Sequence, residues 1–288
     1  MTPPRVTAVL VNYNAGAELR RALQSIAAEM GEQPWEAFVV DNASVDGSAA
    51  IAEEFAPHAR LIANRENVGF ARGVNQGVRA GTASRVLIMN PDCRLVAGAM
   101  AALMSALEAY PSCAIVGPRI LDPDGSVQGS ARGDPNMFTG LFGRTTLLRR
   151  LLPWLSVSRR NVVSAEDARD DGDSVVVDWL SGACMLARKD ALEKVNGFDE
   201  RYFLYWEDAD VCRRLRGAGY HVRYLPGATA IHLVAHSSQR ARSVAIRAFH
   251  ESAYLYYSTH VAPQGLFKRV LARGLLKVRC YMRLRSAA

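Results

Sequence analysis

Several classes of protein are excluded by what this sequence lacks. No apolar run reaches the roughly 18 residues that a membrane-spanning helix needs. The chain enters its first apolar run, at residues 6–11, without a signal-peptide pattern. The five cysteines are widely spaced and form no C-x-x-C pair, the usual sign of a zinc or redox centre. We therefore expect a cytoplasmic protein with reduced cysteines.

Two common nucleotide-binding motifs are also missing. "NYNAGAEL" follows the first apolar run, where a dinucleotide oxidoreductase would carry G-x-G-x-x-G. The P-loop pattern G-x-x-x-x-G-K-[ST] is absent from the chain. These absences argue against nicotinamide-dependent oxidoreductases and P-loop NTPases.

Acidic residues are missing from the end of the chain. None follows Glu251, whereas seven basic side chains lie among large aliphatic ones after it, in a chain with a formal net charge of +7. Apolar residues at i, i+3 and i+4 predict a basic amphipathic helix. This helix would lie on an anionic membrane surface, at the inner face of the cytoplasmic membrane, or pack on the core with a solvated basic face. The interleaved aliphatic residues suit lipid better than nucleic acid, so no nucleic-acid partner is expected.

The first half of the chain alternates short apolar runs with amphipathic segments, a pattern typical of α/β proteins with a mostly parallel, Rossmann-like sheet flanked by helices. The expected strands are 6–11, 37–40, 60–63, 85–89 and 114–117. The expected helices are 17–29, 46–55, 69–80 and 97–109, with Asp46 as N-cap of the second. We expect one domain over 1–240, with a nucleotide-binding part (1–120) and an acceptor part (121–240), followed by a helical extension (241–288).

The second half is less regular. Residues 122–173 predict a long functional loop. Two strands and a short helix are expected over 174–200, then a helix over 208–216. The run "HVRYLPGATAIHL" predicts a strand, a Pro-Gly turn and a second extended segment.

Polar residues follow three of the expected strands: "NYN" at 12–14, "DNASVDGS" at 41–48 and "NPDC" at 90–93. Ligands of open α/β sheets bind beyond the carboxyl ends of the strands, so these residues predict a site at one rim. The Gly-rich run "NVGFARGVNQG" (67–77) is either a turn into a helix or a close approach to a nucleotide, with Arg72 available to a phosphate.

The stretch "FLYWEDADVCRRLR" (203–216) places Glu207, Asp208 and Asp210 directly behind aromatic residues. Adjacent carboxylates repel one another, and apolar neighbours make each charge costlier, so the stretch indicates a site that uses the charge.

Together these motifs, in this order and spacing, resemble the family 2 inverting glycosyltransferases with the GT-A (nucleotide-diphospho-sugar transferase) fold. They look most like bacterial rhamnosyltransferases of cell-surface polysaccharide assembly. The resemblance runs from about Val6 to His236 and includes "LIMNPDCRL", "SGACMLARKDALEKVNGFDERYFLYWEDADVCRRLRGAGY" and "LPGATAIHL". It implies a nucleotide-sugar donor, a divalent metal (Mg²⁺ or Mn²⁺) and inversion at the anomeric carbon.

The resemblance also implies roles for individual residues. Asp92 would be a metal ligand, with Asn90 standing where the family's D-x-D motif has its first acid. His232 would be a second metal ligand or a structural histidine. The donor nucleotide would contact Val11, Asn12, Tyr13, Asn14, Asp41, Asn67, Arg72, Asn90, Pro91 and Asp92.

On the acceptor side, Asp208 would be the catalytic base, and Glu207 would orient the acceptor or take the base's place. Tyr205 and Trp206 would form an acceptor-binding platform or belong to the core. Asp210 would serve the helix N-terminus or pair with Arg213 or Arg214.

The expected donor is dTDP-rhamnose; UDP-linked galactofuranose, glucose or N-acetylglucosamine is the alternative. The expected acceptor is a saccharide on a polyprenyl diphosphate. Two less favoured functions are the alternatives, a different nucleotide-dependent enzyme and a nucleic-acid-binding protein that uses the basic tail. The sequence leaves both a monomer and a homo-oligomer open.

Overall fold

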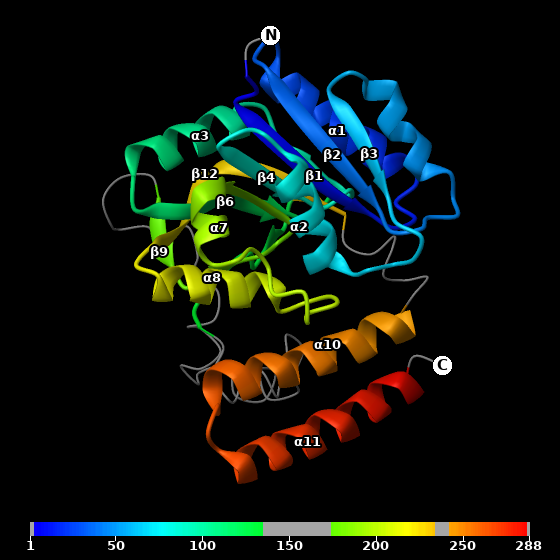
Figure 1. The fold of residues 1–288 in the computed structure, drawn as a ribbon, viewed down its shortest axis with the longest axis vertical. Helices are drawn as coiled ribbons and strands as arrows, with labels where there is room; N and C mark the ends of the chain where they lie inside the picture. The colour runs from blue at the N-terminus through cyan, green and yellow to red at the C-terminus, as the bar shows by residue number, and fades with distance from the viewer. Residues whose placement is uncertain (1–2, 135–173, 234–241, 287–288) are drawn as a thin grey trace.

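The computed structural model describes residues 3–134, 174–233 and 242–286 (Figure 1). Its centre is a sheet in the order β3-β2-β1-β4-β11-β6-β12-β5, with β7 paired to β6 and β9 to β12. The strands of this sheet are β1 (Val6–Asn12), β2 (Trp35–Asp41), β3 (Ala59–Ala63), β4 (Arg85–Met89), β5 (Cys93–Leu95), β6 (Cys113–Leu121), β7 (Val127–Gln128), β9 (Val175–Val177), β11 (Cys184–Arg188) and β12 (His221–His232). A small second sheet pairs β8 (Ala131–Arg132) with β10 (Trp179–Leu180).

The four strands β3, β2, β1 and β4 are parallel, as predicted from the alternating pattern. All residues of β1 and β2 are buried, which is the expected state of strands covered on both faces. The register pairs Asn12 with Asp41, so the polar ends of two strands lie side by side at one rim.

The other half of the sheet is mixed. β11 runs antiparallel between β4 and β6, although it follows β6 in the chain. β12 is one strand with a register shift between Leu225 and Thr229. The predicted Pro-Gly turn is therefore wrong. Pro226 and Gly227 lie at the irregularity instead, where a proline does not interrupt the ladder.

Helices cover both faces of the sheet. α1 (Ala17–Met30), η1 (Ser48–Phe55) and α3 (Ala99–Ala109) contribute to one hydrophobic cluster, and α2 (Phe70–Ala80), α7 (Lys189–Lys194) and α8 (Glu207–Gly217) to the other. η1 is a 3₁₀ helix whose N-cap is Gly47. The prediction of Asp46 as N-cap is wrong by one residue, although its carboxylate still accepts from the backbone N–H and the hydroxyl of Ser48 and from the backbone N–H of Gly16.

The glycines of α2 let this helix lie close to β1. A Cβ atom at Gly77 would come within 2.4 Å of the Val9 side chain, and one at Gly73 within 2.9 Å of Val11. Contacts this short do not occur between real side chains, so glycine is needed here for helix–sheet packing.

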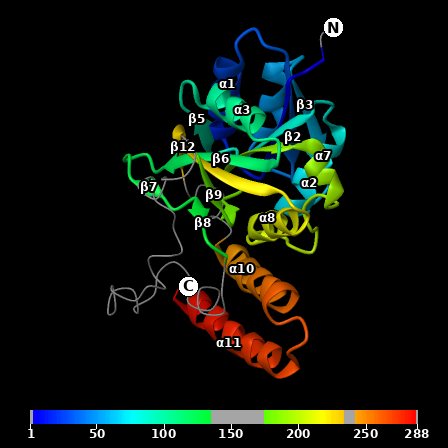
Figure 2. The ribbon, with the colours of Figure 1, turned by 90° about the vertical axis from the view of Figure 1, so that its left-hand side faces the viewer.

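A helical hairpin ends the chain. It consists of α10 (Arg242–Tyr256), the π-helical turn η3 (Tyr257–Val261) and α11 (Leu266–Arg285). Figures 1 and 2 show α10 next to the sheet domain and α11 beyond it. No helix among the described residues is long and apolar enough to cross a membrane. The predicted segments 135–173 and 234–241 lie outside the described residues.

Candidate functional site

Asn12, at the end of β1, organises the donor side of the rim. Its buried amide nitrogen donates to Asp41 Oδ1 at 2.7 Å and to Ser48 Oγ at 2.8 Å. The other carboxylate oxygen of Asp41 accepts from the backbone N–H of Ser44 at 3.0 Å. Asp41 is 4% exposed, so the surrounding donors hold this carboxylate in one orientation. Of its predicted neighbours, Val11 is buried and Tyr13 is half-buried.

Asn14 and Asn67 shape the loops beside this rim. The Asn14 side chain accepts from the backbone N–H of Val45 at 2.8 Å. Asn14 itself has a φ of 54°, a conformation in which Asn is common outside glycine. Asn67 Oδ1 accepts from the backbone N–H of Gly69 at 3.0 Å. Both asparagines therefore hold their own loops in shape, and their contact with a nucleotide stays a prediction.

The Gly-rich run has a structural role in addition to any functional one. Gly69 has a φ of 86°, and a Cβ there would come within 2.5 Å of the Phe203 backbone oxygen. Phe70 donates its backbone N–H to this same oxygen at 2.7 Å. The close backbone approach that Gly69 permits is therefore with the loop before α8. Arg72 pairs with Glu200 at 3.0 Å, so a phosphate would have to compete with this carboxylate.

Asp92 and His232 meet at the end of β4, as the family resemblance implies. His232 Nε2 lies 3.3 Å from Asp92 Oδ1 and 3.2 Å from Asn90 Nδ2. Asp92 is 8% exposed, and Pro91 beside it is buried. The two residues are 140 positions apart in the chain, and β12 pairing antiparallel with β5 brings them together.

Gln128 determines which nitrogen of His232 carries the proton. Its amide nitrogen donates to Asp122 Oδ1 at 2.8 Å and to the His232 carbonyl at 2.9 Å, so its oxygen faces His232 Nδ1, 3.0 Å away. Nδ1 must therefore donate, and in the neutral imidazole this directs the lone pair of Nε2 toward Asp92 and the Asn90 amide.

These residues fit a divalent cation. A carboxylate oxygen and an imidazole lone pair 3.3 Å apart face one another, which is unfavourable unless a proton or a cation lies between or beside them. A histidine ligand commonly donates its other ring N–H to an oxygen, as His232 does to Gln128. Among the described residues, no group of three or more His, Cys, Asp or Glu forms a metal site, so two protein ligands would leave other positions open.

Asp208 and Glu207 differ sharply in environment. Asp208 is half-buried, and its Oδ2 accepts from the backbone N–H of Gly182 at 3.0 Å. Glu207 is 5% exposed, and its Oε2 is buried without a hydrogen-bond partner. Burial raises the pKa of Glu207 well above its ordinary value, and the neighbouring charge of Asp208 raises it further. The raised pKa favours the neutral form of Glu207, and Asp208 is the more accessible carboxyl group of the pair.

The turn before α8 has a strained backbone. Tyr205 and Trp206 have φ values of 68° and 71°, which cost about 1 kcal/mol or more for each non-glycine residue. Helix α10 holds this turn in place. Ser252 donates to the Leu204 carbonyl at 3.0 Å, and the Phe249 ring packs 5.9 Å from both aromatic rings. Both rings are half-buried, so a platform role for them remains a prediction.

Asp210 connects α8 to the C-terminal hairpin. Its side chain is 1% exposed and pairs with Arg214 at 2.7 Å, which confirms one of the two predicted partners. The other oxygen lies 2.6 Å from His260 Nε2, in η3. Arg213 donates to the His260 carbonyl at 3.1 Å. The hairpin is thereby tied to the helix that carries the candidate base in its first turn.

Sequence reasoning missed Gln128, Gly182, Ser252 and His260. Gln128 lies in the segment expected to be irregular, and the other three act through partners at least 26 positions away. No periodic pattern or local motif marks such contacts. The only signal near any of the four was the resemblance at His232, which Gln128 contacts.

Comparison with known proteins identifies the family of this chain. The family model described as glycosyl transferase family 2 matches residues 7–195. A second model, described as the N-terminal domain of galactosyltransferase, matches residues 177–237. The first match covers more than half of the chain.

Two curated relatives are rhamnosyltransferases. The chain is 34% identical to the N-acetylglucosaminyl-diphospho-decaprenol L-rhamnosyltransferase of Mycobacterium tuberculosis, over 97% of this chain and 92% of that protein. It is 43% identical to the rhamnosyltransferase WbbL of Escherichia coli over 81 residues, 28% of this chain and 31% of that one.

Solved glycosyltransferases share the fold. GalNAc-T7, determined with UDP, GalNAc and Mn²⁺, superposes with a TM-score of 0.62 at 12% identity over 94% of this chain and 54% of its own. The mannosyltransferase PcManGT of Pyrobaculum calidifontis, determined with GDP-Man and Mn²⁺, gives 0.58 at 19% identity over 100% of this chain and 74% of its own. The fold is therefore GT-A, and the chain belongs to glycosyl transferase family 2.

Proposed function

We propose that the protein is a metal-dependent inverting rhamnosyltransferase that transfers L-rhamnose from dTDP-rhamnose to a hydroxyl of a lipid-linked saccharide in cell-surface polysaccharide assembly. The similarity to the mycobacterial diphospho-decaprenol rhamnosyltransferase over nearly the whole chain supports this substrate class. The observation that carries the mechanism is the pair of Asp92 and His232 at the donor rim, together with the accessible carboxylate of Asp208 at the start of α8.

Asp208 is the proposed base. As the acceptor oxygen attacks the anomeric carbon, its proton passes to an oxygen of Asp208, while the bond from that carbon to the phosphate oxygen breaks. The electron pair leaves with the nucleoside diphosphate, and attack from the opposite side inverts the centre. The N–H groups of Gly182 and Ala209 hold the carboxylate in place, so that it is pre-positioned for proton transfer.

Asp92 and His232 are the proposed protein ligands of Mg²⁺ or Mn²⁺. Such a cation accepts carboxylate, imidazole and phosphate oxygen ligands, and it neutralises the charge on the departing diphosphate. Asp41, Asn12 and the neighbouring loops are proposed to bind the nucleoside, and Tyr205 and Trp206 the acceptor. A UDP-sugar donor is the second candidate.

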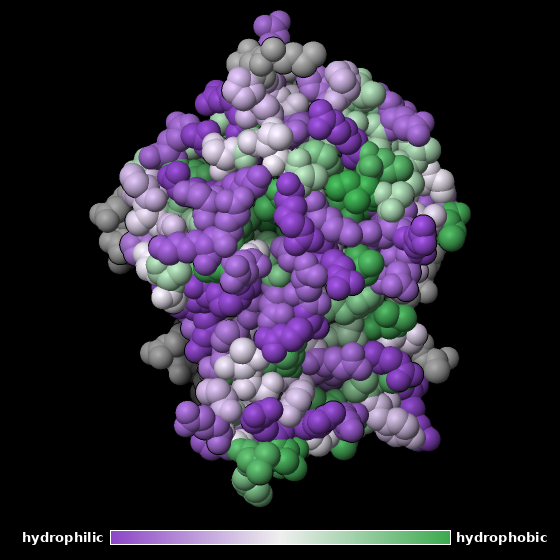
Figure 3. All heavy atoms as spheres, in the orientation of Figure 1, coloured by the Kyte–Doolittle hydropathy of each residue, from purple (hydrophilic) through white to green (hydrophobic). Residues whose placement is uncertain are grey.

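We further propose that α11 lies in the plane of an anionic membrane, at its cytoplasmic face. Its apolar side chains face away from the protein, opposite the buried Ala272 and Leu276. The large side chains on this face are Leu266, Phe267, Val270, Leu271, Leu275, Val278, Tyr281 and Met282, each at least 49% exposed. Figure 3 shows apolar atoms gathered at the end of the molecule where α11 begins.

The charge distribution supports the same orientation. Residues 242–286 contain nine Lys and Arg residues against the single acid Glu251, so the hairpin carries more than the whole net charge of +7. An apolar face bordered by cations is typical of helices that lie in the headgroup region of a bilayer.

The test of the transfer reaction is product formation from dTDP-rhamnose and from UDP-sugars with a diphospho-lipid saccharide acceptor. Asp208→Asn should keep donor binding and lose about 10²–10⁴-fold in turnover. Asp92→Asn should weaken metal-dependent donor binding, measured by calorimetry with and without Mn²⁺. The exposed Asp124→Asn is the matched control. Full turnover by Asp208→Asn, or no binding of any nucleotide sugar by folded wild type, would remove the basis of the proposal.

The membrane proposal is tested by vesicle sedimentation. Phe267→Ser/Leu271→Ser removes two apolar side chains, each of which contributes roughly 1.5–3 kcal/mol when buried. The double variant should leave anionic vesicles, whereas Val45→Ser/Val127→Ser, at exposed positions outside the hairpin, should bind them like wild type. Equal vesicle binding by both double variants would contradict the proposed orientation.

A further inference from the structure

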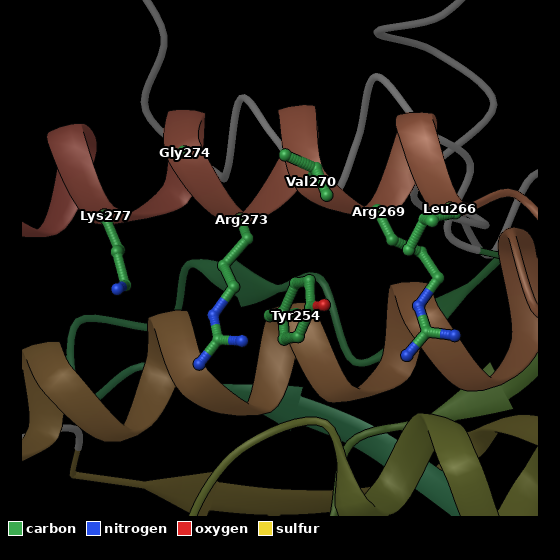
Figure 4. A pocket seen from close by; sticks show the side chains of 7 residues that line it. All are labelled: Tyr254, Leu266, Arg269, Val270, Arg273, Gly274 and Lys277. Carbon is green, nitrogen blue, oxygen red and sulfur yellow. The ribbon is translucent and has the colours of Figure 1, made fainter.

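A groove of about 450 Å³ lies between α10 and α11, outside the candidate active site (Figure 4). Tyr254 of α10 lines one side. The other side is formed by Leu266, Arg269, Val270, Arg273 and Lys277 of α11. In Figure 4 the three cationic side chains extend from α11 toward α10, and Tyr254 lies between two of them.

The groove concentrates positive charge. Arg269, Arg273 and Lys277 follow one another at intervals of four residues, which corresponds to about 6 Å along a helix and places them on one face. Within the described residues, none of the three forms an ion pair with a carboxylate. Like charges at this spacing repel, so a bound anion would stabilise the arrangement.

The two arginines are positioned as anion ligands. Arg269 is half-buried, its Nε is buried without a partner, and its one hydrogen bond within the described chain is a long contact of 3.5 Å to the Pro263 carbonyl. The guanidinium of Arg273 lies over the Tyr254 ring, 5.3 Å from its centre, which fixes its position at the groove. Two guanidinium groups one helical turn apart suit the oxygens of one phosphate group.

The rim of the groove is apolar. Leu266 and Val270 are 75% and 64% exposed, and both belong to the outward apolar face of α11. Inorganic phosphate would contact only the cations. A phosphate that carries acyl chains would contact both the cations and the apolar rim, so the groove suits an amphiphile better than a free anion.

A phosphate bound in this groove would be distinct from that of the acceptor. Helix α10 turns Ser252 toward the loop before the candidate base, whereas Tyr254 faces α11. A helix with its side chains is about 10 Å thick, so α10 separates the groove from Asp208. The sugar of a diphospho-lipid acceptor must reach Asp208, and its diphosphate is therefore expected on the other side of α10.

We propose that this groove is a binding site for one bilayer phospholipid, whose phosphate pairs with Arg269 and Arg273 and whose acyl chains lie along Leu266 and Val270. The inference rests on the proposed membrane association and adds a discrete headgroup site to it. Lys277 supplies a third cation at the end of the groove.

The experiment titrates the full-length protein with a short-chain phosphatidylglycerol below its critical micelle concentration and follows binding by calorimetry. Wild type should bind it saturably, and Arg269→Gln/Arg273→Gln should bind about tenfold or more weakly, because the paired charges that recognise phosphate are removed. Lys268→Gln/Arg285→Gln is the matched control: it removes the same charge from the same helix outside the groove, and should bind like wild type. Equal thermal unfolding of the two variants checks that both are folded.

Three results would overturn the proposal: absence of saturable binding by wild type, equal weakening in both double variants, and inorganic phosphate binding as tightly as the lipid. The last would identify a free-phosphate site. Failure here is distinguishable from failure of the proposed function. Sugar transfer to a soluble acceptor tests the reaction, and vesicle binding by Phe267→Ser/Leu271→Ser tests the membrane orientation independently of the groove.

Discussion

Replacing His260 by alanine removes the contact that joins the C-terminal hairpin to α8. The Asp210 carboxylate is 1% exposed, and His260 Nε2 lies 2.6 Å from its Oδ1. In the variant this oxygen loses its donor, while Arg214 remains on the other oxygen at 2.7 Å. A buried ion pair broken outright costs roughly 3–5 kcal/mol. Because one cation remains, we take the value for a hydrogen bond to a charged group, about 1.5–3 kcal/mol.

We therefore expect His260→Ala to lower the free energy of unfolding by about 2 kcal/mol, which corresponds to a fall in Tm of roughly 4–8 °C for a domain of this size. His260→Gln should recover at least half of the loss, because its amide nitrogen reaches a similar position. The control is His221→Ala, at an exposed position on β12, with an expected change below about 0.5 kcal/mol.

The assay is urea unfolding of each variant, followed by tryptophan fluorescence and by circular dichroism. Sugar transfer is measured alongside, since Asp210 lies within one helical turn of Asp208 and its displacement should lower kcat more than it changes the donor KM. If His260→Ala were no less stable than His221→Ala, the contact between hairpin and α8 would contribute nothing, and the reasoning would be refuted.

Three further predictions follow from single sites. Because burial raises the pKa of Glu207, the folded state retains this proton more strongly than the unfolded state, and the group destabilises the fold increasingly as pH rises above about 4.3. Glu207→Gln should therefore be more stable than wild type in thermal unfolding at pH 7 and no more stable at pH 4; a pH-independent difference would contradict this sign. Gly77→Ala, which places a Cβ 2.4 Å from the Val9 side chain, should destabilise by about 1–3 kcal/mol in urea unfolding, whereas Gly217→Ala, with open space around it, should not. Gln128→Leu should weaken Mn²⁺ affinity in calorimetry about 10–100-fold without changing metal-free nucleotide binding; unaltered Mn²⁺ affinity would argue against its proposed support of His232.

Local patterns account for the correct part of the fold prediction. Strands β1 to β4 and the helices between them are specified by apolar runs and by amphipathic periodicity, both of which involve neighbouring residues. The polar strand ends at Asn12, Asp41 and Asn90 follow from the same reasoning, because parallel strands bring their carboxyl ends to one rim.

Partners distant in the chain explain what was missed. β11 enters the sheet antiparallel between two earlier strands, and its apolar sequence is the same in either direction. The Pro-Gly turn was wrong because pairing with β6 on either side of the irregularity keeps β12 extended through it. The N-cap was predicted at Asp46 because Asp is a preferred N-cap residue, whereas the helix begins one residue later, behind Gly47.

The C-terminal helix and Asp210 show which properties cannot be predicted from neighbouring residues. Composition and periodicity alone predicted a basic amphipathic helix at the end of the chain, because both are properties of adjacent residues. Which face of that helix is buried depends on α10, and the partner of Asp210 depends on η3, 50 residues further along the chain. Contacts of this kind form only when separate elements pack together, and the chain carries no periodic signal for them. Local sequence patterns thus determine the helices, the strands and the polar rim. The contact of Gln128 with His232, the contact of Asp210 with His260 and the groove between α10 and α11 arise only from tertiary packing.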